Sequence, residues 1–137
     1  MEKVNTLIDS LGIETVSLEK DRVVLSMPVD HRTKQPVGFL HGGASVALAE
    51  TAASIGSTLH VDLDKKLVFG MEINANHLRS KRDGTVTAIA TPYHIGRTTM
   101  VWDIKIMDED EKLICISRCR LAAATTSSSS SRPGVFI

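Results

Sequence analysis

The sequence lacks several features that would assign it to common protein classes. Its sixteen basic and sixteen acidic side chains cancel, so no general attraction to nucleic acid or to an anionic membrane surface is predicted. No apolar run approaches the roughly 18 residues that a membrane span needs. Residues 1–10 lack the apolar core of a secretory signal, and we therefore expect a cytoplasmic protein.

Cysteine is scarce, since Cys115 and Cys119 are the only two. The segment around them is typical of a strand, in which residues four apart share a face and lie about 13 Å apart. A disulfide needs α-carbons within about 7 Å, so these two cannot bridge each other in that conformation. No suitably spaced histidine completes a zinc set with them. We interpret both as packing residues and expect no metal or redox cofactor.

The hydrophobic pattern predicts a short helix, two strands, a long helix and four further strands. Apolar residues at helical spacing stop at Gly12, and two strands follow around a polar turn at 19–22. A polar loop from 30 to 38 leads into an alanine-rich helix from about Gly42 to Leu59. The next strand places on one face Leu67, Phe69, Met71, Ile73 and Ala75.

The later part of the chain indicates the architecture. Asp83-Gly84, ahead of the second of the four later strands, is a strong hairpin signal. Short connections imply an antiparallel sheet with the long helix packed on one face, which is an α+β architecture. We assign residues 1–124 to one domain. Residues 125–137, with five serines at 127–131, are predicted to be a disordered tail.

The long helix contains a single carboxylate, Glu50, among small side chains. Small residues on nearly every side would let a curved sheet approach the helix closely. A lone glutamate is most often solvated, and that reading stays open for Glu50. Its apolar neighbours and the lack of a basic partner within one turn favour a second reading, in which it is a base or nucleophile with an altered pKa.

The start of this helix could also take part in catalysis. Gly42 and Gly43 let the backbone approach a ligand closely, and the amides of a first helical turn have no internal partners. The Gly42 N–H is therefore a candidate donor to a developing oxyanion. The alternative is a glycine turn that only joins loop to helix. No phosphate-binding glycine motif is present.

The spacing of Gly42 and Glu50 constrains how they could work together. Eight residues of helix separate them by about 12 Å along the axis. An oxyanion donor must lie about 3 Å from its oxygen. If both groups are catalytic, we expect them to come from different chains, with two antiparallel helices across a two-fold axis placing each Glu50 beside the other Gly42.

Three stretches resemble one known family: "GFLHGGASVALAETAAS", "MEINANHLR" and "HIGRTTMVWDIKIMDEDEKLICISRCRLA". They are similar to hotdog-fold acyl-CoA thioesterases, in the branch with phenylacetyl-CoA, 4-hydroxybenzoyl-CoA and 1,4-dihydroxy-2-naphthoyl-CoA hydrolases. The resemblance covers nearly the whole chain before the serine tail. It implies an antiparallel sheet wrapped around a long central helix, and a homodimer with shared active sites that commonly pairs into a homotetramer.

The resemblance also implies roles for individual residues. Glu50 would attack the thioester carbonyl or activate water, and the Gly42 N–H would polarise that carbonyl. Gln35 and His41 would bind and orient the thioester, and Ser54 would assist water or the leaving thiolate. The implied positions for substrate and CoA are Gly70, His77, Leu78, Arg79, Ser80, His94, Ile95, Gly96, Arg97, Thr98 and Thr99.

Several of these positions have ordinary alternatives. Gln35 could be a plain loop amide, His77 a satisfied core histidine, and Arg79 with its basic neighbours a solvated strand end. The charge of Arg79 equally suits the phosphates of CoA. The acyl group is the least determined part, with Phe39, Leu59, Val68 and Met71 as candidates to shape its pocket.

Three classes of function follow from the resemblance. The leading one is hydrolysis of acyl-CoA thioesters, with a 1,4-dihydroxy-2-naphthoyl ester of menaquinone synthesis as the first candidate substrate. Phenylacetyl, benzoyl or medium-chain acyl groups are alternatives. A hotdog hydratase or dehydratase would need other histidine–acid motifs. A non-catalytic acyl-CoA sensor would usually carry a basic DNA-binding segment, which this sequence lacks.

Overall fold

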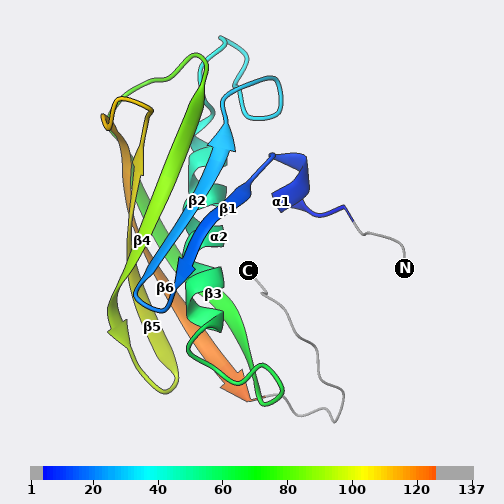
Figure 1. Ribbon diagram of the computed structural model, residues 1–137, viewed down its shortest axis with the longest axis vertical. Helices are drawn as coiled ribbons and strands as arrows, with labels where there is room; N and C mark the ends of the chain where they lie inside the picture. Colours follow the sequence, from blue (N-terminus) through cyan, green and yellow to red (C-terminus); the bar gives the residue numbers. More distant parts are fainter. Residues whose placement is uncertain (1–4, 126–137) are drawn as a thin grey trace.

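The computed structural model describes residues 5–125 as one curved sheet with a long helix on one side (Figure 1). The helices are α1 (Leu7–Ser10) and α2 (Gly42–Thr58), and α2 packs against β2 to β6. The strands, in chain order, are β1 (Glu14–Glu19), β2 (Arg22–Pro28), β3 (Lys66–His77), β4 (Thr85–Ile95), β5 (Thr99–Met107) and β6 (Leu113–Thr125). The predicted order of elements and the α+β class are confirmed.

The sheet has the strand order β1-β2-β4-β5-β6-β3, and every neighbouring pair is antiparallel. β1 and β3 are therefore its two edges. β6 continues through Thr125, which pairs with Lys66, so the strand includes the first residue that we assigned to the tail. The rest of the predicted tail lies outside the described residues, as does Val4 of the predicted first helix.

Small residues bring α2 close to the sheet, as predicted. A β-carbon on Gly56 would lie 2.6 Å from the ring of Trp102, the largest fully buried side chain, so only glycine fits there. The Trp102 indole N–H donates to the hydroxyl oxygen of Ser57 across 2.8 Å. This bond satisfies both polar groups in a fully buried position and fixes the helix against β5.

Both cysteines are buried and unbridged, which confirms that they pack the core. Burial, with the nearby charges of Glu50 and Glu72, raises the pKa of the Cys119 thiol to about 12. The thiol therefore stays protonated and unreactive at neutral pH. Among the described helices, none is both long and apolar enough to cross a membrane.

Two local predictions are wrong. The hairpin expected at Asp83-Gly84 does not form between β3 and β4, because β4 pairs with β2 and β5 while β3 pairs with β6. Gly84 does adopt a positive φ of 83°, but its turn leads the chain across the fold to a distant position in the sheet. A turn signal specifies local conformation and leaves the strand partner open.

The apolar face predicted for β3 is also wrong in its first half. A bulge between Gly70 and Glu72 interrupts the pairing with β6 and shifts the alternation of side chains. Val68 is therefore buried, while Phe69 and Met71 are exposed by 36 % and 54 %. Beyond the bulge, Ile73 and Ala75 pack against the core as expected.

Candidate active site

A histidine side chain caps the start of α2. His41 is the N-cap residue, and its Nδ1 accepts a hydrogen bond of 2.8 Å from the Gly43 N–H. The neutral ring must then carry its proton on Nε2, where it can be donated to a ligand. The Gly43 amide is thereby used within the chain. No described residue accepts a hydrogen bond from the Gly42 N–H, which remains available at the positive end of the helix.

Gly42 faces the imidazole of His77, at the end of β3. A β-carbon at position 42 would lie 2.8 Å from Nε2 of His77, so a side chain there would have to displace the ring. His77 is therefore neither a fully buried core histidine nor a remote strand end. Its ring lies beside Gly42, and both residues line the same cavity.

The loop before the helix fixes the orientation of Gln35. Its Oε1 accepts hydrogen bonds from the backbone N–H groups of Val37, across 2.6 Å, and Phe39, across 3.3 Å. Two backbone donors identify that atom as the carbonyl oxygen and leave the amide NH₂ free to donate. Gln35 is thus more than a plain loop amide, because it orders its loop and still offers a donor group.

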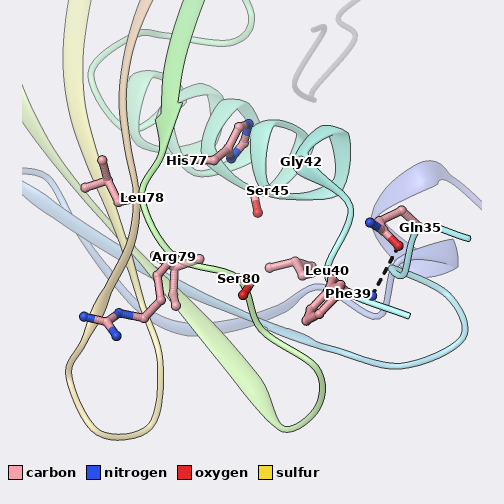
Figure 2. Close-up of a pocket in the computed structure, with 10 residues that line it drawn as sticks. Gln35, Phe39, Leu40, Gly42, Ser45, His77, Leu78, Arg79 and Ser80 are labelled. Carbon is pink, nitrogen blue, oxygen red and sulfur yellow. Dashed lines mark hydrogen bonds between the residues drawn. The ribbon is translucent and has the colours of Figure 1, made fainter. Parts of the chain in front are cut away.

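Gln35, Gly42 and His77 line a cavity of about 420 Å³ (Figure 2). His41 does not line it and instead borders a separate cavity of about 280 Å³, together with Gly43. The lining of the larger cavity joins the loop before α2, the first turn of α2, and the segment after β3: Gln35, Phe39, Leu40, Gly42, Ser45, His77, Leu78, Arg79, Ser80 and Ile114. The structure thus brings together most of the predicted residues from the helix start and the first predicted CoA-binding segment. We refer to this space as the donor cavity.

Glu50 lies on α2 next to Gly70 of β3. Its carboxylate contacts the α-carbon side of Gly70 so closely that a β-carbon there would overlap Oε2 and lie 3.2 Å from Cδ. No described residue forms a hydrogen bond or an ion pair with this carboxylate. Partial burial raises the pKa of Glu50 above its usual value. The direction of this shift is the one that burial without a partner produces, and the role of Glu50 as base or nucleophile stays a prediction.

Glu50 lines a second, more apolar cavity of about 490 Å³, which lies between α1 and α2. It is lined by Thr6, Leu7, Ile8, Gly43, Val46, Ala47, Glu50 and Thr51. Ser54, one turn after Glu50, is fully buried, and its hydroxyl has no hydrogen-bond partner among the described residues. Glu50 and Gly42 therefore face different cavities of the same chain, as the spacing along the helix predicted.

The second predicted CoA-binding segment, 94–99, lies at the turn between β4 and β5. The Lys66 ammonium group donates to the carbonyl oxygen of Arg97 across 2.8 Å, which ties this turn to the start of β3. The first segment, 77–80, follows the other end of β3. Within one chain, the two segments thus lie at opposite ends of the same edge strand.

Sequence reasoning missed part of both cavities. Ser45 and Leu40 line the donor cavity, and Leu7 of α1 lines the other. Ser45 could have been found, because it lies three residues after Gly42 and so shares its helical face. Of the residues proposed for the acyl pocket, Phe39 lines the donor cavity, whereas Met71 is exposed at the bulge of β3. Among residues 5–125, no group of three metal-ligating side chains comes together.

Comparison with known proteins identifies the family of the chain. The family model described as "Thioesterase superfamily" matches residues 37–115. The esterase ComA2 of Bacillus subtilis is 61 % identical over 89 % of this chain and 97 % of its own. The 1,4-dihydroxy-2-naphthoyl-CoA hydrolase of Listeria monocytogenes is 56 % identical over 85 % of this chain and 94 % of its own.

A crystal structure gives the same result for the fold. Thioesterase HI1161 from Haemophilus influenzae superimposes with a TM-score of 0.86 at 48 % identity, over 90 % of this chain and 86 % of that one. The chain therefore belongs to the thioesterase superfamily. Its sheet and central helix form the hotdog fold, and the protein is a thioester hydrolase.

Proposed function

We propose that the protein hydrolyses acyl-CoA thioesters at a site shared between two copies of the chain. The observation that carries this proposal is the separation of two unsatisfied groups. The Gly42 amide lies in the donor cavity, while the Glu50 carboxylate lies beside Gly70 and opens elsewhere. Neither group has a partner among residues 5–125, and each is of the kind that a thioester reaction needs.

The edge strand β3 offers a way to join them. Gly70 contacts Glu50, and His77 contacts Gly42, so both groups are anchored to the same strand. Antiparallel pairing of β3 with a second β3, with the two-fold axis between residues 73 and 74, would set Gly70 opposite His77 of the other copy. Paired strands lie about 4.8 Å apart. Glu50 of one copy and the Gly42 amide of the other would then reach one thioester.

The same pairing would unite the two proposed CoA-binding segments. The turn at 94–99 is tied to the start of β3, and residues 77–80 follow its end. Antiparallel pairing would bring the start of one β3 beside the end of the other. Arg97 of one copy and Arg79 of the other would then lie along one path, where guanidinium groups suit the phosphates of CoA.

The proposed reaction uses only protein groups, contributed by the two copies of the chain. The Gly42 N–H donates to the thioester oxygen as negative charge develops there, and the free Gln35 amide and the His41 Nε2–H orient the carbonyl. The Glu50 carboxylate then attacks the carbonyl carbon and expels CoA thiolate, and water hydrolyses the mixed anhydride. Alternatively, Glu50 takes a proton from water, which attacks directly. In both routes Ser54 assists the water or the thiolate.

The acyl group is proposed from the relatives. The Listeria monocytogenes protein is named for 1,4-dihydroxy-2-naphthoyl-CoA, and we propose the same substrate class here. ComA2 is more similar in sequence, and its name gives no substrate, so a broader aromatic or medium-chain specificity is the second candidate. We also propose that neither metal nor redox cofactor takes part, that two dimers form a tetramer, and that the protein acts in the cytoplasm.

One experiment tests both activity and site sharing. Release of free thiol is measured with a panel of aromatic and aliphatic CoA esters. Glu50→Gln and Gly42→Pro chains are then denatured, mixed and refolded together. Each hybrid dimer has one intact site and one site lacking both groups, and half of the dimers are hybrids, so we expect about a quarter of wild-type activity from two inactive parents.

The outcomes separate the two parts of the proposal. A wild-type protein that releases no thiol from any CoA ester contradicts the activity. An active wild type whose variants recover nothing on mixing contradicts the shared site and leaves hydrolysis standing. Wild-type chains taken through the same denaturation and refolding provide the control for recovery.

A further inference from the structure

The donor cavity contains a buried hydroxyl that the mechanism above does not use. We propose that the Ser45 hydroxyl binds the substrate, by a hydrogen bond with the pantetheine amide nearest to the thioester. This inference rests on the proposed function and names a further contact in the same site. Ser45 is only 1 % exposed, yet it lines the donor cavity. Figure 2 shows its oxygen projecting from α2 towards the side of Leu40 and Ser80.

Three other hydroxyls on the same helix have partners, whereas that of Ser54 has none among the described residues. Thr51 donates to the carbonyl oxygen of Ala47, and Thr58 donates to that of Ile55, each across 2.6 Å. Ser57 accepts the indole N–H of Trp102. No described residue forms a hydrogen bond with the Ser45 side chain. Its oxygen is not among the buried unpaired atoms, so it is reachable from the donor cavity that Ser45 lines. A hydroxyl that faces a cavity without a protein partner can bond to a ligand group there.

The position of Ser45 fits a particular part of the substrate. It lies three residues after Gly42, which is about 4.5 Å along the helix axis and on the same face. Helical side chains lean towards the N-terminus, so its hydroxyl is directed towards the turn that carries the Gly42 amide. In CoA, only two methylene groups separate the thioester sulfur from the first amide nitrogen. With the thioester held at the Gly42 N–H, this amide is the first polar group of pantetheine that could reach a hydroxyl one turn along the helix.

The rest of the donor cavity suits pantetheine better than an acyl chain. Its walls include Phe39, Leu40 and Ile114, which can contact methylene groups. The polar residues Gln35, Ser45 and His77 also line it, and so does the exposed Arg79. Pantetheine likewise combines amides with apolar carbons, and it ends in the phosphates of CoA. A hydrocarbon acyl group would leave these polar groups unpaired.

The test compares Ser45→Ala with thioesters that share one acyl group. The CoA ester and the N-acetylcysteamine ester contain the first amide, whereas the ethanethiol ester has none. We expect kcat/KM to fall about 5- to 10-fold for the first two, the effect of one hydrogen bond, through a higher KM. The ethanethiol ester should be unaffected. Thr58→Ala is the control, because its hydroxyl bonds within α2 and should change none of the three.

Three results would overturn the inference: an equal loss with the ethanethiol ester, a loss confined to the CoA ester, or no loss at all. Binding provides a readout that does not depend on turnover. In a Glu50→Gln background, adding Ser45→Ala should weaken acyl-CoA binding by the same factor in calorimetry. If the wild type hydrolyses no ester but Ser45→Ala still weakens acyl-CoA binding, the proposed function is wrong and the role of Ser45 in binding is supported. If the wild type hydrolyses esters and Ser45→Ala does not weaken binding, only the role of Ser45 is wrong.

Discussion

The two halves of the candidate site differ in how they are held. Around Gly42, hydrogen bonds within the chain orient the candidate donors and leave the Gly42 N–H itself free. His41 caps the Gly43 amide, and Gln35 accepts two backbone hydrogen bonds in its loop. Around Glu50, the described chain supplies no such support. The carboxylate has neither hydrogen bond nor ion pair, and the buried Ser54 hydroxyl has no partner.

This difference indicates what each half needs from outside the chain. The donor half is already oriented, so binding there requires little reorganisation, which is the condition for effective oxyanion stabilisation. The acidic half keeps a partly buried charge without compensation, which costs stability and is typical of functional carboxylates. One chain thus prepares the donors completely and leaves the acid to be completed by substrate, water or a second copy.

Removing the donor should have the largest effect. Proline at position 42 deletes the amide hydrogen, and proline is well tolerated as the first residue of a helix. The preceding His41 already has an extended conformation, with φ of −71° and ψ of 129°, which suits a residue before proline. We expect kcat for acyl-CoA hydrolysis to fall about 10²- to 10³-fold, the usual effect of losing one oxyanion donor.

Gly42→Ala is the matched control for this change. Alanine adds the same β-carbon against His77 but keeps the N–H. Its loss in kcat, from displacing the imidazole, should be clearly smaller than that of Gly42→Pro. Equal kcat values for the two variants would mean that the added β-carbon against His77 causes the defect, and that the loss of the amide hydrogen does not.

Substitutions at Gln35 test whether this residue only orders its loop or also donates a hydrogen bond to the substrate. Gln35→Glu keeps oxygens that accept from Val37 and Phe39, but it loses the NH₂ donor and adds negative charge near the thioester oxygen. Gln35→Ala loses the acceptors and the donor together. We expect Gln35→Glu to fold with an unchanged Tm and to lose about 10-fold or more in kcat/KM. Normal kcat/KM with Gln35→Glu, alongside a defective Gln35→Ala, would reduce Gln35 to a loop-ordering residue.

Much of the fold could be predicted from local patterns. Helical spacing and small residues located α2, and the period of two located the strands. The bulge in β3 could not be predicted, because Gly70 interrupts the alternation only in the folded sheet, where it makes room for Glu50. Likewise, Asp83-Gly84 indicated a turn correctly. The partner of β4 depends on contacts between strands that are distant in sequence.

The candidate site divides in the same way. A carboxylate in an apolar helix and glycines at a helix start were visible in the sequence, because composition and position along one helix define them. The hydrogen bond that fixes the Gln35 amide and the contact between Gly42 and His77 were not, because they depend on how a loop and a strand end fold against the helix. Side chains that line a cavity from several elements, as Ile114 does, carry no local signal.

The smallest expected effect concerns stability on the acidic side. Burial raises the pKa of Glu50, so its ionised form destabilises the folded chain. Glu50→Gln should therefore raise Tm by roughly a few degrees at any pH above this raised pKa, where the wild-type carboxylate is charged. Because the folded-state pKa is the higher one, this advantage should shrink as pH falls through it, and vanish below the usual glutamate value.

Glu109 provides the control with the opposite sign. The hydrogen bond from Lys81, with backbone hydrogen bonds, lowers the pKa of Glu109 to about 2. Glu109→Gln should therefore lower Tm at neutral pH, and the difference should disappear only as pH falls towards 2. Thermal unfolding of both variants and the wild type across pH measures the two effects together. If Glu50→Gln also lowered Tm at neutral pH, Glu50 would have a stabilising partner in the folded protein, and the contrast between the two halves of the site would be lost.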